Sequence, residues 1–524
     1  MASGLVALGA PNRWPGICVA ALLAALVLGT LAAVAAAAGG LSGLGVWDWR
    51  AVWFTIWQAA LSATLSALLA VPVARALARR SFPGRGVLVT LLGAPFILPV
   101  IVAIMGLIAI FGRSGLANEA LRALGLPELS IYGWQGVILA HVFFNLPLSV
   151  RLILQGWLAI PSERFRLAES LGFAPGDVAR HLEWPMLRAV LPGVWLAVFL
   201  VCLTSFTVAL ALGGGPRATT IELAIYQAFR FDFDLGRAAT LGLVQVALCL
   251  AALALTARIT VPAAFGAGLD ARRRVAGPGG GYVMADALAI GLAAGFLILP
   301  MVSVIALGLP RIPGLPMPIW IAAGRSVVMA LISAALTLTL GLALALALAD
   351  PRRRWRDLAL EGAGMLPLVA SPLVLGTGLY LLLRGVARPE QMALPVTVVI
   401  NAIMALPFAL RALIPAAREV RADYGRLAES LDLRGRAALR LLWLPRLARP
   451  MGFAGGLAAA LAMGDLGVIT LFADNNNATL PLKLYQLMNS YRSADAAAVA
   501  VLLMVISFAL FWAFDQGGRV NAGR

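Results

Sequence analysis

The sequence predicts an all-α integral membrane protein with about twelve transmembrane helices, arranged as two parallel six-helix repeats. The 524 residues are 61% hydrophobic and only 12% charged, and the mean hydropathy is +0.92. Apolar stretches of about 20 residues recur along the chain, and each is long enough for one helix across a hydrocarbon core of about 30 Å. In addition, the residues 166–171 (RLAESL) recur letter for letter as 426–431.

Helices are predicted for the apolar stretches because barrel-type alternation is absent and lipid cannot satisfy open backbone groups. The first stretch is longer than the usual signal-peptide core, so we expect it to be retained as a span. Cys18, Cys202 and Cys249 fall inside predicted spans, so no disulfide framework is expected. The twelve expected spans are 17–39, 53–77, 87–111, 134–158, 190–212, 238–257, 285–308, 326–349, 359–383, 393–414, 451–472 and 496–516.

The net charge of +17 is distributed as membrane topology requires. When loops are assigned alternately to the two sides, 29 of the 41 Lys and Arg residues fall on the side that holds both repeats and both termini. The positive-inside rule makes that side cytoplasmic. Because basic clusters beside spans are what topology alone demands, we expect no nucleic-acid partner.

The repeat divides the chain into two halves. We predict a first repeat over 1–276, a cytoplasmic linker over 277–284 and a second repeat over 285–524. Six spans return the chain to its starting side, so the halves are parallel and related by a pseudo-twofold axis along the membrane normal. Pro95 and Pro99 in one third span match Pro367 and Pro372 in the other, and they predict kinks or breaks there.

Each half carries a polar cytoplasmic element between its fourth and fifth spans, over 161–188 and 418–448. Ser162 is expected to cap a short helix that Gly172 ends in the left-handed conformation, and a second helix is expected to start near Pro175. Asp432 replaces the glycine in the second copy, so we expect the two turns to differ. Each copy would present an apolar edge, formed by Phe165, Ala168, Leu171, Val178 and Leu182 in one and by Leu427, Leu431, Leu439 and Leu442 in the other.

A second pair of segments follows the fifth spans, on the opposite side of the membrane. Residues 218–227 parallel 478–486, and each follows a flexible turn, at 213–216 and at 474–477. We expect a loop and then a short amphipathic helix at the outer surface in each half.

The repeated element resembles that of ATP-binding-cassette importer permeases. Their pattern is Glu-Ala-Ala, three residues, Gly, nine residues and Ile-x-Leu-Pro. Gly172 and the residues 182–185 (LEWP) fit this spacing, as do 442–445 (LWLP), whereas Arg-Leu-Ala stands in both copies where Glu-Ala-Ala is usual. Within this family the whole chain is similar to the two-halved thiamine permeases, notably over 212–227 and 479–492.

The resemblance implies an importer in the bacterial inner membrane that takes thiamine from a periplasmic binding protein, and it leaves open whether thiamine phosphate esters are carried. Two copies of a cytoplasmic ATPase would supply the energy. Consistent with this, the only lysine is Lys483, preceded by Leu482, so the chain cannot form a P-loop. The residues expected to couple to the ATPase are Arg166, Ala168, Glu169, Leu171, Gly172, Pro185, Arg426, Ala428, Glu429, Leu431, Asp432 and Pro445. Those expected to contact the binding protein are Glu222, Tyr226, Gln227, Lys483, Tyr485 and Gln486.

The translocation path is assigned to Asp465 in the eleventh span and to Ser205 at the matching position of the first half. A carboxylate inside a span is expensive and faces a bundle interior or a wet cavity, and it would suit a cationic cargo. The bland alternative is a helix-end residue with a backbone or serine partner.

Other functions stay open at this point. A permease of the same class for ferric iron or another small solute fits the two-halved design equally well. An ion-coupled secondary transporter should carry several acids or histidines inside its spans, and only Asp465 is clearly central. His141 and His181 lie on different segments and offer no metal-ligand spacing. We therefore expect no metal, no cofactor and no catalytic residues.

Overall fold

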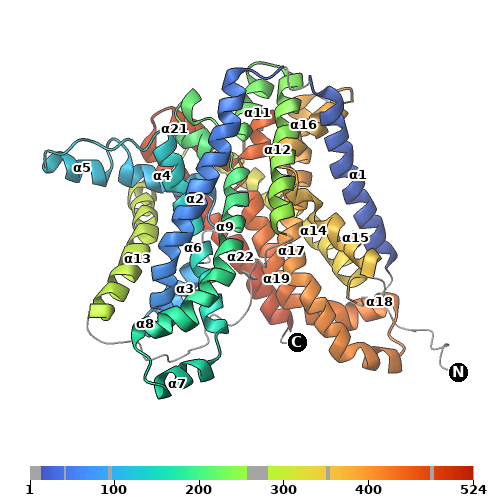
Figure 1. The fold of residues 1–524 in the computed structure, drawn as a ribbon. Coiled ribbons are helices and arrows are strands. Elements are labelled where there is room, and N and C mark those ends of the chain that lie inside the picture. The colour runs from blue at the N-terminus through green and yellow to red at the C-terminus, as the bar shows by residue number, and fades with distance from the viewer. Residues whose placement is uncertain are drawn as a thin grey trace.

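The computed structural model describes residues 13–39, 43–92, 97–256, 281–349, 354–386, 388–472 and 477–522. Every regular element within these ranges is a helix, which confirms the all-α prediction (Figure 1). Eleven described helices are long and apolar enough to span a membrane, and a strongly bent pair raises the number to twelve if it counts as one span. This agrees with the predicted number.

The elements that lie wholly within the described residues up to 256 are twelve α-helices and two short helical turns. The π-helical turn is η3 and the 3-10 turn is η4. The elements are α1 (Trp14–Ala37), α2 (Val46–Arg79), α3 (Arg85–Leu91), α4 (Val100–Phe111), α5 (Leu116–Ala123), α6 (Trp134–Ala159), α7 (Ser162–Ser170), α8 (Pro175–Val178), η3 (Ala179–Glu183), α9 (Trp184–Leu203), α10 (Thr207–Leu212), η4 (Pro216–Ala218), α11 (Ile221–Arg230) and α12 (Leu235–Thr256).

The second part repeats much of this order. Its π-helical turn is η7, and η5 and η6 are 3-10 turns. The elements are α13 (Gly281–Gly308), η5 (Leu309–Gly314), α14 (Met317–Ala347), α15 (Arg354–Met365), η6 (Leu366–Leu368), α16 (Pro372–Leu383), α17 (Pro389–Ser430), α18 (Gly435–Ala438), η7 (Leu439–Trp443), α19 (Leu444–Met463), α20 (Gly467–Phe472), α21 (Leu480–Asn489) and α22 (Ser493–Ala522).

Helix bounds recur at the offset of the sequence repeat. The elements α8, η3, α9 and α10 begin and end at positions that match those of α18, η7, α19 and α20 in the second repeat. One tertiary hydrogen bond recurs as well. The N–H of Ile221, the first residue of α11, donates to Thr55 Oγ1 at 2.9 Å, and the N–H of Leu480, the first residue of α21, donates to Ser326 Oγ at 2.8 Å. Both halves therefore attach this short helix to their second long helix in the same way.

The third span of each half is broken, as the prolines there predict, so neither 87–111 nor 359–383 forms one continuous helix. In the first half α3 ends at Leu91 and α4 begins only at Val100, after Pro99. In the second half the helical segment that ends at Leu368 and the following α16 are bent by 94°. Proline lacks the N–H that a continuous helix needs at these points, and this accounts for the breaks. Pro95 lies outside the described residues.

The second half of the predicted linker, residues 281–284, belongs to a helix. Helix α13 already begins at Gly281, so the last four residues of the predicted linker are helical, and residues 277–280 lie outside the described ranges.

The first helix of each half packs mainly on the other half. Helix α1 lies against α14, α15 and α16, and α13 lies against α2 and α4. Ion pairs support both exchanges: Arg13 Nη1 stands 3.2 Å from Asp357 Oδ1 of α15, and Arg80 Nε at the end of α2 stands 2.6 Å from Asp286 Oδ2 of α13. The two halves are therefore interlocked.

Small residues allow a close crossing of α19 and α22 in the second half. A Cβ added to Gly452 of α19 would stand 2.5 Å from the carbonyl oxygen of Phe514 in α22, and one added to Gly518 would stand 2.5 Å from that of Ala448. Helices in lipid associate through such close backbone packing, because lipid tails are as apolar as the side chains.

The elements that matter for function gather at opposite ends of the molecule. Helices α7 and α18 lie at one end, here named the α7 end, where α1 begins and α22 finishes, whereas α11, α16 and α21 lie toward the other, the α11 end (Figure 1).

Candidate functional site: two exposed helices and a seam between the halves

The two copies of the repeated element present the same surface. Leu171 is 62% exposed and Leu431 is 60% exposed. Arg166, Glu169, Arg426 and Glu429 are also exposed, while Ala168 and Ala428 are buried beneath them. Each copy thus exposes a leucine among charged residues at a matched position of its half.

The turn after each helix has the same geometry, which corrects the expectation that Gly172 and Asp432 give different turns. Their φ angles are +72° and +48°. In the first copy Phe173 N–H donates to Ala168 O at 3.0 Å, and in the second Leu433 N–H donates to Ala428 O at 2.9 Å. These are the bonds of a helix end closed by a left-handed residue. Aspartate tolerates that conformation better than most residues with a side chain, so the turn survives the substitution.

The approach to the exposed helix differs between copies. In the first, Pro161 precedes α7 and Ser162 is its first helical residue. The Ser162 hydroxyl bonds Glu163 Oε1 at 3.0 Å, so the predicted cap by Ser162 is wrong. In the second copy α17 runs from the membrane to Ser430 without a break, and Arg421 pairs with Glu429 at 2.9 Å. The second helix predicted near Pro175 is present as α8.

The return into the membrane is anchored differently in the two halves. Each return passes through a five-residue π-helical turn, η3 or η7, ahead of Pro185 or Pro445. In the first half the last residue of this turn, Glu183, is buried and accepts Arg75 Nη2 at 2.8 Å and Arg79 Nη2 at 2.6 Å, both from α2. Its counterpart in the second half is the buried Trp443. Ion pairs therefore anchor this turn in the first half, and a buried apolar side chain anchors it in the second.

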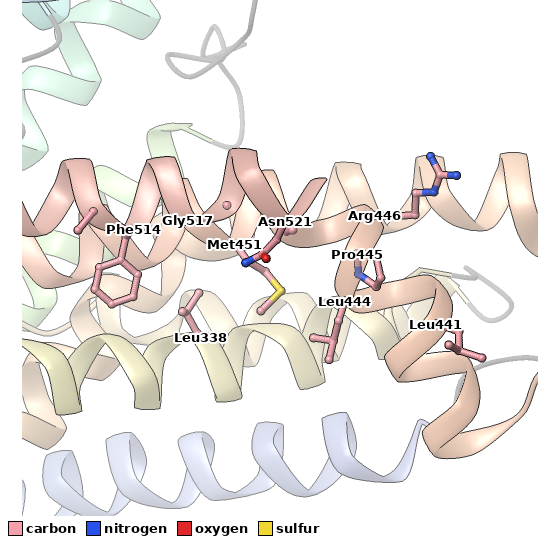
Figure 2. A pocket seen from close by; sticks show the side chains of 13 residues that line it. Leu338, Leu441, Leu444, Pro445, Arg446, Met451, Phe514, Gly517 and Asn521 are labelled. Atoms are coloured by element: carbon pink, nitrogen blue, oxygen red, sulfur yellow. The ribbon is translucent and has the colours of Figure 1, made fainter. Parts of the chain in front are cut away.

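A cavity of about 1050 Å³ lies behind the second anchor, between α14, α19 and α22 (Figure 2). Leu338, Met451 and Phe514 form much of its apolar wall, and Leu441 marks its α7 end. Gly452 of α19 also lines it, whereas the exposed Leu461 stands nine residues further along α19. Nine residues amount to two and a half helical turns. Gly452 and Leu461 therefore point to opposite sides of α19, and the cavity lies on the side away from Leu461.

The predicted path residues lie at matched interruptions in the fifth spans. Ser205 lies between α9 and α10, and Asp465 lies between α19 and α20. Asp465 Oδ1 accepts the N–H of Gly467 at 3.1 Å, whereas no described residue hydrogen-bonds Oδ2. One oxygen thus serves the start of α20, as the structural alternative requires, and Asn401 of α17 lies close enough to the carboxylate to act on it.

The two interruptions meet near the contact between the halves, here named the seam. A Cβ added to Gly467 would stand 3.9 Å from Phe206 Cδ1 of the first half, and one added to Gly464 would stand 3.1 Å from Pro99. The broken third and fifth spans of the two halves therefore converge at the seam. Non-helical backbone inside a membrane is tolerated where protein buries it or a wet cavity borders it.

Two glutamines that the sequence analysis did not single out support the first interruption. Gln58 Nε2 donates to Cys202 O at 3.0 Å, and Gln245 Nε2 donates to Leu203 O at 2.9 Å. Both carbonyls belong to the end of α9, where the helix stops providing donors. The sequence signal that could have identified them is a glutamine inside each of two otherwise apolar spans.

The short helices α11 and α21 are present, but α11 does not lie on the surface as expected. Most of its residues are buried against α12, α2 and α16. Aromatic rings from both halves meet beside it: Phe229 of α11 stands 4.8 Å from Tyr380 of α16 and 6.0 Å from Phe472 of α20, measured between ring centroids. A third contact joins Phe206 to Tyr226 at 5.4 Å. These rings close the seam at the α11 end.

The residues predicted to contact a partner are not equally available. Tyr226, Gln227, Lys483, Tyr485 and Gln486 are half-buried, whereas Glu222 has no accessible surface. The expectation for Glu222 is therefore wrong in this conformation, because its helix is wedged into the seam. A cavity of about 240 Å³ opens beside α21, and Lys483 and Gln486 are among its lining residues.

The chain is similar to known proteins over nearly its whole length. No protein-family model matches it. The thiamine transport system permease protein ThiP of Salmonella typhimurium is 40% identical over 514 residues, which cover 96% of each chain. The protein of the same name from Escherichia coli is 39% identical over 514 residues and 96% of each chain. That from Haemophilus influenzae is 33% identical over 449 residues, covering 84% of this chain and 83% of its own.

Proposed function

The chain belongs to the family of thiamine transport system permeases, and we propose that it carries thiamine from a periplasmic binding protein into the cytoplasm. It is then the multi-pass inner-membrane permease subunit of an ATP-driven importer, and ATP hydrolysis belongs to a separate subunit. The single observation that carries this proposal is the 40% identity along 96% of both chains. The interlocked all-helical membrane fold supports it.

The exposed helix of each half is proposed as the docking site for one ATPase subunit, so that two copies bind. The support is the matched pair of exposed leucines, Leu171 and Leu431, on identical turns. Arg166, Glu169, Arg426 and Glu429 surround them. A cytoplasmic α7 end places both termini in the cytoplasm, as the charge distribution predicts.

The six-plus-six division stays the domain proposal, with repeats over 1–276 and 285–524. The recurrence of helix bounds at the offset of the sequence repeat supports it. The exchange of α1 and α13 adds that neither repeat is a separate compact unit.

The cargo route is proposed to follow the seam, with Asp465 and Ser205 on its wall. The place of both residues at matched interruptions of the fifth spans, beside the contact between the halves, supports this assignment. The binding protein is proposed to dock at the α11 end, against Tyr226, Gln227, Lys483, Tyr485 and Gln486. The cavity beside Lys483 and Gln486 offers room for a side chain of that partner.

Uptake of labelled thiamine into proteoliposomes tests the function. The permease is reconstituted with its ATPase, and the loaded binding protein is added outside. We expect accumulation that needs both partners and ATP and that persists with a protonophore. Persistence without the ATPase, with collapse by the protonophore, would instead indicate an ion-coupled transporter.

Competition identifies the cargo. Unlabelled thiamine should block uptake of the label, and thiamine monophosphate and ferric iron form two further arms. Uptake of iron but not of thiamine would contradict the proposed cargo while leaving the importer class intact.

A further inference from the structure

Glu222 is the most unusual acid in the described part of the chain. It lies in the first turn of α11 with no accessible surface, and no described residue makes a hydrogen bond to either carboxylate oxygen. Burying a carboxylate without donors is costly, and native proteins keep few such groups. A role in another conformation, in which the seam is open and the carboxylate is accessible, would account for such a residue.

The fold does not need this acid. Helix α11 is capped by Thr220, whose Oγ1 accepts the N–H of Leu223 at 3.4 Å, and it is fixed to α2 by the bond between Ile221 N–H and Thr55. The second half builds the same attachment with Leu480 and Ser326, and the residue that matches Glu222 there is Pro481. A structural requirement common to both halves would place an acid in both.

Glu222 lies where the two halves of the chain contact each other. Helix α11 packs against α16 of the second half, and Ser371 at the N-terminus of α16 lies close enough to the carboxyl group to act on it. The Ser371 hydroxyl accepts the N–H of Val374 at 3.2 Å through its oxygen, which leaves its own O–H to point toward Glu222. Separation of α11 from α16 would uncover the carboxylate.

Aromatic rings share this face of α11. Phe229 stands seven residues after Glu222, and residues seven apart lie on the same face of a helix. The Phe229 ring meets Tyr380 and Phe472 of the second half. A carboxylate and aromatic rings on one helix face are the combination that recognises an organic cation, through charge and through cation–π attraction.

We propose that Glu222 is a specificity-determining residue of the transport route, which binds an aromatic organic cation when α11 and α16 separate. This rests on the proposed function, since it assumes that the cargo passes along the seam. Glu222 acts with Asp465, so that each half supplies one acid. The position that matches Glu222 in the second half holds Pro481, and the position that matches Asp465 in the first half holds Ser205. The binding route is therefore asymmetric although the fold around it is repeated.

Charge removal tests the role. In the thiamine uptake assay Glu222→Gln should lower uptake at limiting thiamine about tenfold, the loss expected for one charge-assisted contact. ATPase activity stimulated by the loaded binding protein should stay within about twofold of wild type, because a neutral amide leaves assembly intact. Glu222→Asp should recover part of the uptake, and Glu119→Gln, which removes an exposed acid from α5, should have no effect. Unchanged uptake in Glu222→Gln would overturn the proposal.

Accessibility provides a test that does not depend on cargo identity. Cys18, Cys202 and Cys249 are replaced by Ala, and Glu222→Cys is added and probed with a water-soluble charged thiol reagent. We expect labelling only during turnover with binding protein and ATP. Failure to label during turnover, while Glu119→Cys on the exposed surface of α5 labels in the same background, would overturn the proposal. Absence of thiamine uptake by the wild type would contradict the proposed cargo instead.

Discussion

Gly172 and Asp432, which occupy matching positions of the two repeats, adopt the same left-handed backbone conformation at the end of the two exposed helices. The turn is closed by equivalent hydrogen bonds in both, so the conformation is set by the surrounding element and not by the residue at the turn. A residue with a Cβ pays for this conformation, and glycine does not.

Asp432→Gly should therefore stabilise the permease, by about 1 kcal/mol. The ion pair that Asp432 makes with Arg434 is exposed and offsets little of this gain. Thermal unfolding of the purified protein in detergent measures the change, with Gly172→Ala as the opposite control, which should lower the midpoint. A lower midpoint in Asp432→Gly would show that the ion pair matters more than the backbone strain.

Leu171→Asp combined with Leu431→Asp should abolish copurification of the ATPase and thiamine uptake, because a charge would be desolvated in each apolar contact. Membrane insertion should be unchanged, since both side chains are exposed. Leu126→Asp is the matched control, because this leucine is 51% exposed outside the proposed docking surface. Normal ATPase copurification in the double variant would refute the docking surface.

Glu183→Ala should lower stability by about 3 kcal/mol, because it leaves the guanidinium groups of Arg75 and Arg79 without their shared partner. Adding Arg75→Leu and Arg79→Leu to Glu183→Trp imitates the apolar anchor that Trp443 forms in the second half, and it should recover much of the loss. The thermal midpoint in detergent checks both steps. If Glu183→Ala unfolds at the wild-type temperature, the ion cluster does not anchor this turn.

Asp465→Asn should reduce thiamine uptake with little loss of assembled complex. The amide oxygen can still accept the N–H of Gly467, so the start of α20 is kept while the charge is lost. Ser205→Ala, the change at the matching position, should have a smaller effect. Uptake kinetics identical to wild type in Asp465→Asn would leave this residue with its helix-end role alone.

Cysteines introduced singly at Gln227, Lys483 and Gln486 should form crosslinks to the binding protein, since these side chains are half-buried near the α11 end. A cysteine at Arg436 in α18, at the other end of the molecule, should form none. Crosslinks that stay within the permease would make these residues part of its own packing.

The spans were predictable because their length and apolarity are set by the bilayer and need no knowledge of neighbours. The left-handed turn at Gly172 was predictable from local residue chemistry. The pairing of α1 with the second half was not, because hydropathy does not say which helix an apolar helix will meet in lipid.

The burial of Glu222 also escaped the sequence. The apolar stripe of α11 fits a helix lying on a surface as well as one wedged between two halves, because both have one apolar face. The contacts of α11 with α12, α2 and α16, the last of which belongs to the other half of the chain, decide between them. Asp465 was recognisable earlier because a charge inside a span is rare whatever surrounds it.

The exchange of α1 and α13 has a consequence for synthesis. Helix α1 leaves the ribosome first, yet the helices that cover it, α14 to α16, follow only after the whole first half has been made. Until then its packing face meets lipid, which is tolerable because tails solvate apolar side chains. Arg13 must likewise wait for Asp357. Completion of the first half thus depends on translation of the second, and a chain stopped at the linker would leave α1 packed on α12 but without its partners in the second half.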